Sequence, residues 1–173
     1  MRALIQRISH GKVTVDGEIT GQVNNGGILI FLGVTHTDTS EDVRYLARRV
    51  VNLRIFHDDE GKMNRSLLDI GGGALVVSQF TLYADSRKGN RPGYSDAALP
   101  DHAEKLYEEF KSELQTYPLA EFGCGIFGAE MMVDFCNMGP VTICLNRKNE
   151  KKSCSSRKHR LRRMQCLQST RIS

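Results

Sequence analysis

Short runs of β-branched and other apolar residues, separated by turn-forming residues, dominate the first third of the chain. Residues 4–8 and 12–15 are two such runs, and Asp16-Gly17 supplies the residues that a tight hairpin turn prefers. A second turn at residues 24–27 precedes residues 28–34, an apolar run suited to a buried strand. The pattern predicts a hairpin followed by a buried strand.

Two later segments show apolar residues at helical spacing. In the first, Thr39 is the expected N-cap, and Glu41 and Asp42 favour the positive end of the helix dipole. Pro100, a residue favoured in the first turn, begins the second helix. The apolar positions are Val43, Leu46, Ala47 and Val50 in the first helix, and Ala103, Leu106, Tyr107, Phe110 and Leu114 in the second.

The remaining pattern predicts further strands. Residues 53–56 favour a strand followed by a turn at 57–62, and residues 74–82 form the strongest strand pattern in the chain. Two more strands are expected at residues 129–136 and 140–145, with a turn-like break between them. We therefore expect a single-domain α+β fold, with a β-rich, twisted or barrel-like sheet and two main helices.

Composition bounds the class of protein. The 173 residues suffice for one domain, and 40% hydrophobic with 25% charged residues is typical of a soluble globular protein. No apolar run reaches the roughly 20 residues that a membrane-spanning helix needs, and the N-terminal residues show no secretory-signal pattern. We therefore expect a cytoplasmic protein with no membrane partner.

The formal net charge of +4 is unevenly distributed along the chain. Residues 146–173 carry ten Lys/Arg residues and one acidic residue (+9), whereas residues 1–145 carry 14 and 19 (−5). Nucleic-acid contact would therefore come from a local patch or from the tail. Because residues 146–173 also lack apolar periodicity, we expect a basic, disordered tail after a folded domain of residues 1–145.

The usual signatures of nucleotide-binding, serine-hydrolase and zinc-protease sites are absent from the sequence. It has no P-loop, GxGxxG, GxSxG or HExxH motif, and its five histidines lack metal-ligand spacing. The five cysteines form no CxxC pair, and Cys136 and Cys144 are expected to be small buried residues. Cys154, His159 and Cys166 are only a weak indication of a metal site. We therefore expect neither a metal nor a cofactor.

Polar residues interrupt the strand expected at residues 74–82. Ser78, Gln79 and Thr81 stand among apolar neighbours, and a buried amide or hydroxyl without a partner costs about 1–3 kcal/mol. These groups can satisfy the neighbouring backbone or form a functional site, and this segment alone favours neither. The loop that follows contains three basic residues, Arg87, Lys88 and Arg91.

Two motifs resemble those of the D-aminoacyl-tRNA deacylases. Residues 78–82, Ser-Gln-Phe-Thr-Leu, are similar to the SQFTL motif of that family, and residues 137–142, Asn-Met-Gly-Pro-Val-Thr, to its NxGPVT motif. Met138 and Cys124 stand where family members often have Asp and Thr. The resemblance covers approximately residues 1–145 and includes four further segments, residues 1–7, 52–56, 88–92 and 125–131.

The resemblance implies a homodimer with its active site at the subunit interface. In that family the Gly-Pro peptide is cis and enters the active site of the opposite subunit, so Gly139 and Pro140 would meet residues 78–81 of the partner. The two carbonyl oxygens of such a peptide point in nearly the same direction and would hold the α-amino group of the substrate. An L side chain would collide with this clamp, whereas a D side chain or the hydrogen of glycine would not.

The implied activity is hydrolysis of the ester between tRNA and a D-amino acid or glycine. Gln79 and main-chain N–H groups near Phe80 would receive the developing oxyanion, while Ser78 and Thr81 would position groups. Thr81 is not our preferred nucleophile, because no His or Lys of the motifs is placed to deprotonate it.

The resemblance also implies the residues that support the clamp and bind the tRNA. Arg7 would orient the clamp through hydrogen bonds, and Asn137 belongs to the same substrate-binding group. Contacts with tRNA phosphates are expected from Arg87, Lys88 and Arg91.

Two alternative functions remain open. The chain could be a nucleic-acid-binding module that acts through its basic tail, residues 157–163 in particular. It could also be a conventional Thr- or Ser-dependent hydrolase of a small ester, in which case the tRNA part of the substrate would not matter.

Overall fold

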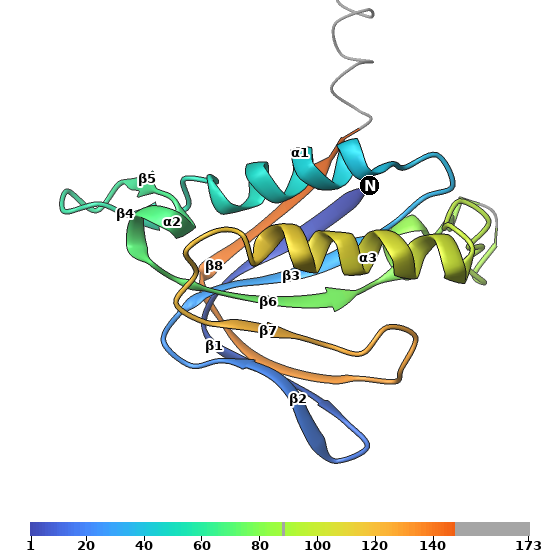
Figure 1. Cartoon of the computed structure of the whole chain (residues 1–173), viewed down its shortest axis with the longest axis horizontal. Coiled ribbons are helices and arrows are strands. Elements are labelled where there is room, and N and C mark those ends of the chain that lie inside the picture. Colours follow the sequence, from blue (N-terminus) through green and yellow to red (C-terminus); the bar gives the residue numbers. More distant parts are fainter. Residues whose placement is uncertain (88, 148–173) are drawn as a thin grey trace, which may run out of the picture.

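The computed structural model describes residues 1–87 and 89–147, which are arranged around one mixed sheet (Figure 1). The strands of this sheet are β1 (Arg2–Val15), β2 (Glu18–Val23), β3 (Gly27–Gly33), β6 (Gly73–Ser78), β7 (Phe122–Cys124) and β8 (Met132–Asn146). A separate two-stranded sheet consists of β4 (Phe56–His57) and β5 (Met63–Arg65). The helices are α1 (Ser40–Val51), α2 (Leu67–Ile70), α3 (Pro100–Leu114) and the 3-10 turn η1 (Phe80–Tyr83).

Strand β1 has hydrogen-bonded partners along both of its edges. One edge pairs antiparallel with β3 in the first half of the strand and with β2 in the second half, while the opposite edge pairs with β8. The sequence predicts two short strands here, separated near Ser9 and His10, and this prediction is wrong. The strand continues because β8 keeps pairing with β1 across the point where the other edge changes partner.

The sheet nearly closes on itself where β2 approaches β7, as the barrel-like prediction requires. A Cβ atom on Gly21 would lie 2.3 Å from the main-chain nitrogen of Cys124, and one on Gly123 would lie 2.6 Å from that of Gln22. Only residues without a side chain allow two backbones to come this close. The closure of the sheet therefore depends on these two glycines.

Helices α1 and α3 pack against each other and cover the same face of the sheet (Figure 1). The main core lies between these helices and the sheet, and a second apolar cluster lies on the other face. Strand β3 contributes to both, since Ile28, Ile30 and Leu32 face the main core and Leu29 faces the second cluster. Burial on both faces explains why residues 28–34 are apolar without alternation.

Both predicted helices form, and α1 begins at the predicted N-cap. The Asp42 carboxylate accepts hydrogen bonds from the Thr39 N–H at 3.0 Å and from the Thr39 hydroxyl at 3.1 Å. Donors at the start of a helix otherwise lack intrahelical partners, so this contact stabilises the first turn.

Three predicted strands differ from the structure. Of residues 53–56, only Phe56 is in a strand. It belongs to β4, which pairs with the short β5 through two residues only. The strand predicted at residues 74–82 ends at Ser78 and gives way to η1. The break predicted at residues 137–139 does not divide the strand, because β8 continues from Met132 to Asn146, but its pairing with β1 is interrupted at residues 138–141.

Cys136 and Cys144 are exposed, so the prediction that both are buried is wrong. Successive side chains of a strand point to opposite faces, and only one face of this part of β8 is covered. Ile143 and Leu145 pack against the main core, which leaves Cys144 on the uncovered face.

The folded part of the chain extends slightly beyond the predicted boundary at residue 145. Asn146 is the last residue of β8, and Arg147 donates hydrogen bonds to Asp42 at 3.0 Å and to Glu41 at 3.1 Å. The rest of the predicted tail, residues 148–173, lies outside the described residues. Within the part of the chain that the structure describes, we find no helix long and apolar enough to cross a membrane.

Replacing Gly21 by alanine is expected to lower the free energy of unfolding by about 1–3 kcal/mol, because the new methyl group would overlap the backbone of β7. Urea denaturation followed by circular dichroism measures this change. Gly93→Ala is the matched control, since its nearest neighbour would be 3.9 Å away and its effect should stay within about 0.5 kcal/mol. Equal effects of the two substitutions would contradict the role assigned to Gly21.

Candidate active site

Residues 78–80 border an apolar cavity of about 620 Å³ between the sheet and the start of α3. This volume is within the range of about 300–1,000 Å³ that is usual for small-molecule sites. Strand β6 brings Ser78 to the cavity, and η1 then carries Phe80 to its border. The other residues around the cavity are mostly apolar and include Leu32, Val77, Tyr94, Ala98, Tyr107 and Met131.

The polar groups of this segment are more accessible than a buried strand would allow. The Gln79 N–H donates to the Leu32 carbonyl at 2.7 Å, and the chain then turns into η1, which leaves Thr81 exposed. The Gln79 amide donates to the Thr81 hydroxyl at 2.5 Å. The prediction of buried amide and hydroxyl groups is therefore wrong for Thr81, and the two polar side chains partner each other.

Two exposed aromatic rings meet beside the cavity. Phe80 is 58% exposed and Tyr94 is 42% exposed, and their rings contact edge to face with 5.0 Å between centroids. Tyr94 is fixed from both sides, because its neighbour Gly93 exchanges two backbone hydrogen bonds with Asp85 and its own carbonyl accepts from Ala97 at 3.0 Å. The rings thus form a rigid apolar surface at the edge of the cavity.

The basic loop between Asp85 and Gly93 contains the residues expected to contact tRNA. The Arg87 guanidinium pairs with the Asp85 carboxylate at 2.7 Å and, through hydrogen bonding, lowers the pKa of that carboxyl to about 2. Arg87 is nevertheless highly exposed, as is Arg91. Lys88 lies outside the described residues.

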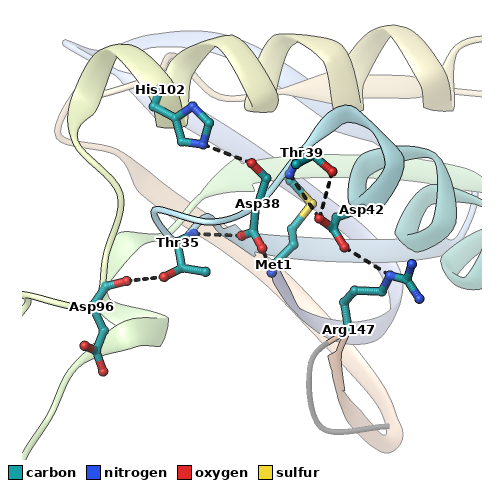
Figure 2. A network of polar contacts seen from close by, with 8 residues as sticks. All are labelled: Met1, Thr35, Asp38, Thr39, Asp42, Asp96, His102 and Arg147. Carbon is teal, nitrogen blue, oxygen red and sulfur yellow. Dashed lines mark hydrogen bonds and ion pairs between the residues drawn. The ribbon is translucent and has the colours of Figure 1, made fainter. Parts of the chain in front are cut away.

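A polar network around the buried pair Met1 and Asp38 holds the wall of the cavity that precedes α3 (Figure 2). The Asp38 carboxylate accepts hydrogen bonds from the Met1 α-ammonium group at 2.5 Å and from the Thr35 N–H at 2.8 Å. The His102 ring donates to the main-chain carbonyl of Asp38 at 3.1 Å. The Thr35 hydroxyl donates to the carbonyl of Asp96 at 2.6 Å. Asp96 directly precedes two alanines that line the cavity, so the network fixes their position.

Tyr107 is a buried titratable residue of the cavity lining. Its hydroxyl contacts the carbonyl oxygens of Val76 and Gly125 at 3.1 Å each, and burial raises its pKa above the ordinary value. A phenol that is neutral and already engaged with two carbonyls cannot act as a general base. The cavity therefore offers polar main-chain and amide groups rather than an acid–base pair.

The second motif forms a wide bulge in β8. Gln6 of β1 pairs with Thr142 and Ile8 pairs with Asn137, so that the four residues 138–141 stand opposite Arg7 alone. Bulges redirect a strand and present its backbone to the surface.

Arg7 and Asn137 fasten this bulge. Arg7 is 4% exposed, and its guanidinium donates to the Met138 carbonyl at 3.1 Å and to the Ile55 carbonyl at 2.6 Å. The Asn137 side-chain oxygen accepts from the Val141 N–H at 2.9 Å. The bulge therefore keeps a defined shape although most of its residues are exposed.

Gly139 has a backbone conformation that is strained for any residue with an L side chain. Its φ is +120°, and a Cβ atom there would lie 2.7 Å from the Arg7 guanidinium. The peptide bond between Gly139 and Pro140 is cis. Both residues are exposed and bring main-chain atoms to the surface of β8.

The two motifs do not meet within one chain. The described residues that line the cavity include none from the 137–141 segment. Arg2 of β1 holds η1 through the Leu82 carbonyl at 2.6 Å, whereas Arg7 holds the bulge. Arg7 lies five positions after Arg2 along the extended strand, which corresponds to about 17 Å between their Cα atoms.

Several large apolar side chains of β8 are exposed. Met132 is 70% exposed, Met138 42% and Phe135 36%, all on β8. Away from β8, the apolar side chains of Leu99 and Ile126 are also exposed. Leu99 lines the cavity, and Ile126 directly precedes the lining residue Phe127. Such groups of exposed apolar side chains often mark an interface.

The structure also identifies residues that the sequence analysis did not select. Gln6 contacts two residues of the second motif, and Asp38 and Thr35 hold the cavity wall. In the sequence, these residues are distinguished only as polar residues close to apolar runs. Within residues 1–87 and 89–147, we find no cluster of His, Cys, Asp and Glu residues that could hold a metal ion.

Comparison with known proteins gives consistent matches. A family model described as D-Tyr-tRNA(Tyr) deacylase matches residues 4–146. A D-aminoacyl-tRNA deacylase of Thermosipho africanus is 54% identical over 148 residues, covering 86% of this chain and 98% of the relative. One from Clostridioides difficile is 56% identical over 146 residues, covering 84% and 97%.

Two solved structures are also similar. One, titled c-Myc DNA Unwinding Element Binding Protein, has a TM-score of 0.79 and 38% identity, covering 84% of this chain and 98% of that chain. The other, a probable eukaryotic D-amino acid tRNA deacylase, has a TM-score of 0.70 and 18% identity, covering 83% and 97%. At that identity the second match concerns the fold alone.

Proposed function

The chain belongs to the D-Tyr-tRNA(Tyr) deacylase family, and from this membership we propose that it hydrolyses the ester bond of D-aminoacyl-tRNA, releasing tRNA and the D-amino acid. The observation that carries the proposal is the position of residues 78–81, which expose amide, hydroxyl and main-chain groups beside an apolar cavity. The protein is thus a carboxylic ester hydrolase that acts in the cytoplasm during quality control of translation.

The active site is completed by a second copy of the chain. The lining of the cavity supports this arrangement, because it includes no described residue of the 137–141 segment of the same chain. The exposed apolar side chains of β8 supply a surface for the contact. In the homodimer, Gly139 and Pro140 of one protomer lie against residues 78–81 of the other.

The main-chain oxygens of Gly139 and Pro140 bind the α-amino group of the substrate. Arg7 and Asn137 keep these oxygens in place, as their hydrogen bonds to Met138 and Val141 support. With the amino group fixed, an L side chain is directed into the clamp and is rejected by steric overlap, whereas a D side chain points to open space. Glycine has no side chain to reject, so glycyl-tRNA(Ala) is also a substrate.

Hydrolysis depends on positioning and on stabilisation of the oxyanion. Main-chain N–H groups at the start of η1 lack intrahelical partners and, together with Gln79, receive the negative charge. Ser78 and Thr81 orient the ester, and the hydrogen bond from Gln79 to Thr81 supports this shared role. Arg87, Lys88 and Arg91 contact phosphates of the acceptor end without reading its sequence.

The purified homodimer is expected to hydrolyse D-Tyr-tRNA while leaving L-Tyr-tRNA intact. Gly139→Ala is expected to abolish most of this discrimination, because the new methyl group displaces Arg7 and reshapes the clamp. Initial rates on the two matched esters, with the dimeric mass confirmed by light scattering, measure both effects. Gly61→Ala controls for backbone strain, since Gly61 also has a positive φ (+78°) but nothing within 4 Å.

Hydrolysis of neither ester by dimeric protein would refute the proposed activity. Equal hydrolysis of both by the wild-type protein would refute the clamp alone. Equal rates on D-Tyr-tRNA and on a simple D-Tyr ester would instead favour a Thr- or Ser-dependent hydrolase of small esters.

Thr81→Ala is expected to lower kcat by no more than about tenfold, the effect of one lost hydrogen bond, because the hydroxyl only positions groups. Gln79→Ala should lower kcat more, by about 100-fold, as the loss of an oxyanion donor does. Single-turnover kinetics on D-Tyr-tRNA distinguish these effects from changes in binding. Complete loss of turnover in Thr81→Ala with unchanged binding would instead make Thr81 the nucleophile.

A second candidate function is nucleic-acid binding through the basic tail. It is favoured by one observation, the strong positive charge of the segment that follows the folded domain. Deletion of residues 148–173, a segment with nine Lys/Arg and one acidic residue, is expected to reduce a salt-sensitive RNA affinity and to leave deacylation within about twofold. Filter binding at several salt concentrations measures the affinity, and an unchanged affinity would remove this candidate.

A further inference from the structure

Gln6 bridges the two ends of the bulge in β8. Its side-chain oxygen accepts from the Asn137 amide and from the Thr142 hydroxyl, the latter at 2.6 Å. The Asn137 amide also contacts the Thr142 hydroxyl at 3.3 Å. These three side chains therefore form one polar group across the narrow part of the bulge, where β8 leaves and rejoins its pairing with β1.

The contact with Gln6 determines which way the Asn137 amide faces. Because the nitrogen of that amide donates to Gln6, its oxygen is directed to the other side, where it accepts from the Val141 N–H at 2.9 Å. A reversed amide would place two donors against each other at Val141. The acceptor on Gln6 is thus what keeps the Val141 contact in place.

Gln6 and Arg7 hold the bulge from different directions. Neighbouring residues of a strand project to opposite faces, and Arg7 reaches the Met138 carbonyl from the buried face. Gln6 is only partly buried and joins Asn137 and Thr142, the residues that flank the bulge on its two sides. Without Gln6, the two flanks of the bulge would lose their bridge while Arg7 still held Met138.

We propose that Gln6 is a positioning residue that sets the discrimination between D- and L-aminoacyl esters. This inference rests on the proposed clamp function of Gly139 and Pro140. Steric rejection of an L side chain requires that the clamp cannot move aside, and Gln6 supplies that restraint through Asn137. The groups proposed for hydrolysis lie in residues 78–81 of the other protomer, so Gln6 acts on selectivity rather than on turnover of the D ester.

The test compares two substitutions of similar size. Gln6→Met removes the acceptor, whereas Gln6→Glu keeps an oxygen that can accept from both donors. The ratio of kcat/KM for D-Tyr-tRNA to that for L-Tyr-tRNA is expected to fall by about tenfold or more in Gln6→Met, the size expected when neutral hydrogen bonds are lost. In Gln6→Glu it should stay within about threefold of the wild-type ratio. At saturating D-Tyr-tRNA the two variants should have a similar kcat, because the groups proposed for hydrolysis lie in residues 78–81.

An unchanged ratio in folded, dimeric Gln6→Met protein would refute the inference while leaving the proposed function intact. Failure of the wild-type protein to hydrolyse the D ester would refute the function itself. A parallel loss of D and L hydrolysis would also refute the inference, since a merely structural role affects both.

If Gln6→Met does not fold, a double-mutant cycle with Gln6→Ala and Asn137→Ala tests the same contact. The inference requires that each single substitution lowers the D-to-L ratio and that the double variant falls little further. Additive effects on the ratio would show that the two residues act separately and would overturn it.

Discussion

The pairing of β1 along both edges is the constraint on which the other features depend. It makes β1 the strand that is fixed most firmly in the sheet, and side chains from this strand hold both functional segments. Arg2 binds the carbonyl of Leu82 in η1, and Arg7 and Gln6 bind the bulge in β8. The cavity segment and the bulge are therefore held at a set separation by one strand.

The proposed second protomer follows from where the two motifs lie. The described lining of the cavity includes no residue of the 137–141 segment of the same chain, so the clamp at that cavity would come from a symmetric partner. Two copies can exchange clamps without any change in either fold. The exposed apolar side chains Met132 and Phe135 lie on the strand that carries the bulge, so contact and catalysis would draw on the same strand.

The sequence predicted the parts of the fold that follow from local periodicity. Both main helices, the hairpin at Asp16-Gly17 and the buried strand β3 have patterns that only one local structure satisfies. The other elements of the fold depend on turn residues and on long-range strand pairing, which local periodicity does not reveal. The apolar residues of η1 match a strand as well as a 3-10 turn, and the continuous course of β8 depends on its partner β1. The local sequence shows Gln6 only as a polar residue beside an apolar run, because its role depends on contacts 131 and 136 residues away.

The bulge recognises its neighbours through main-chain atoms, and this affects how the motif can vary. Met138 stands within the motif, yet its contact with Arg7 is made by its carbonyl oxygen, which every amino acid possesses. The side chain at this position is consequently uncoupled from the geometry that Arg7 enforces. A substitution of Met138 therefore keeps the main-chain contact with Arg7. A substitution of the neighbouring Gly139 does not leave the bulge unchanged, because any side chain there would collide with Arg7.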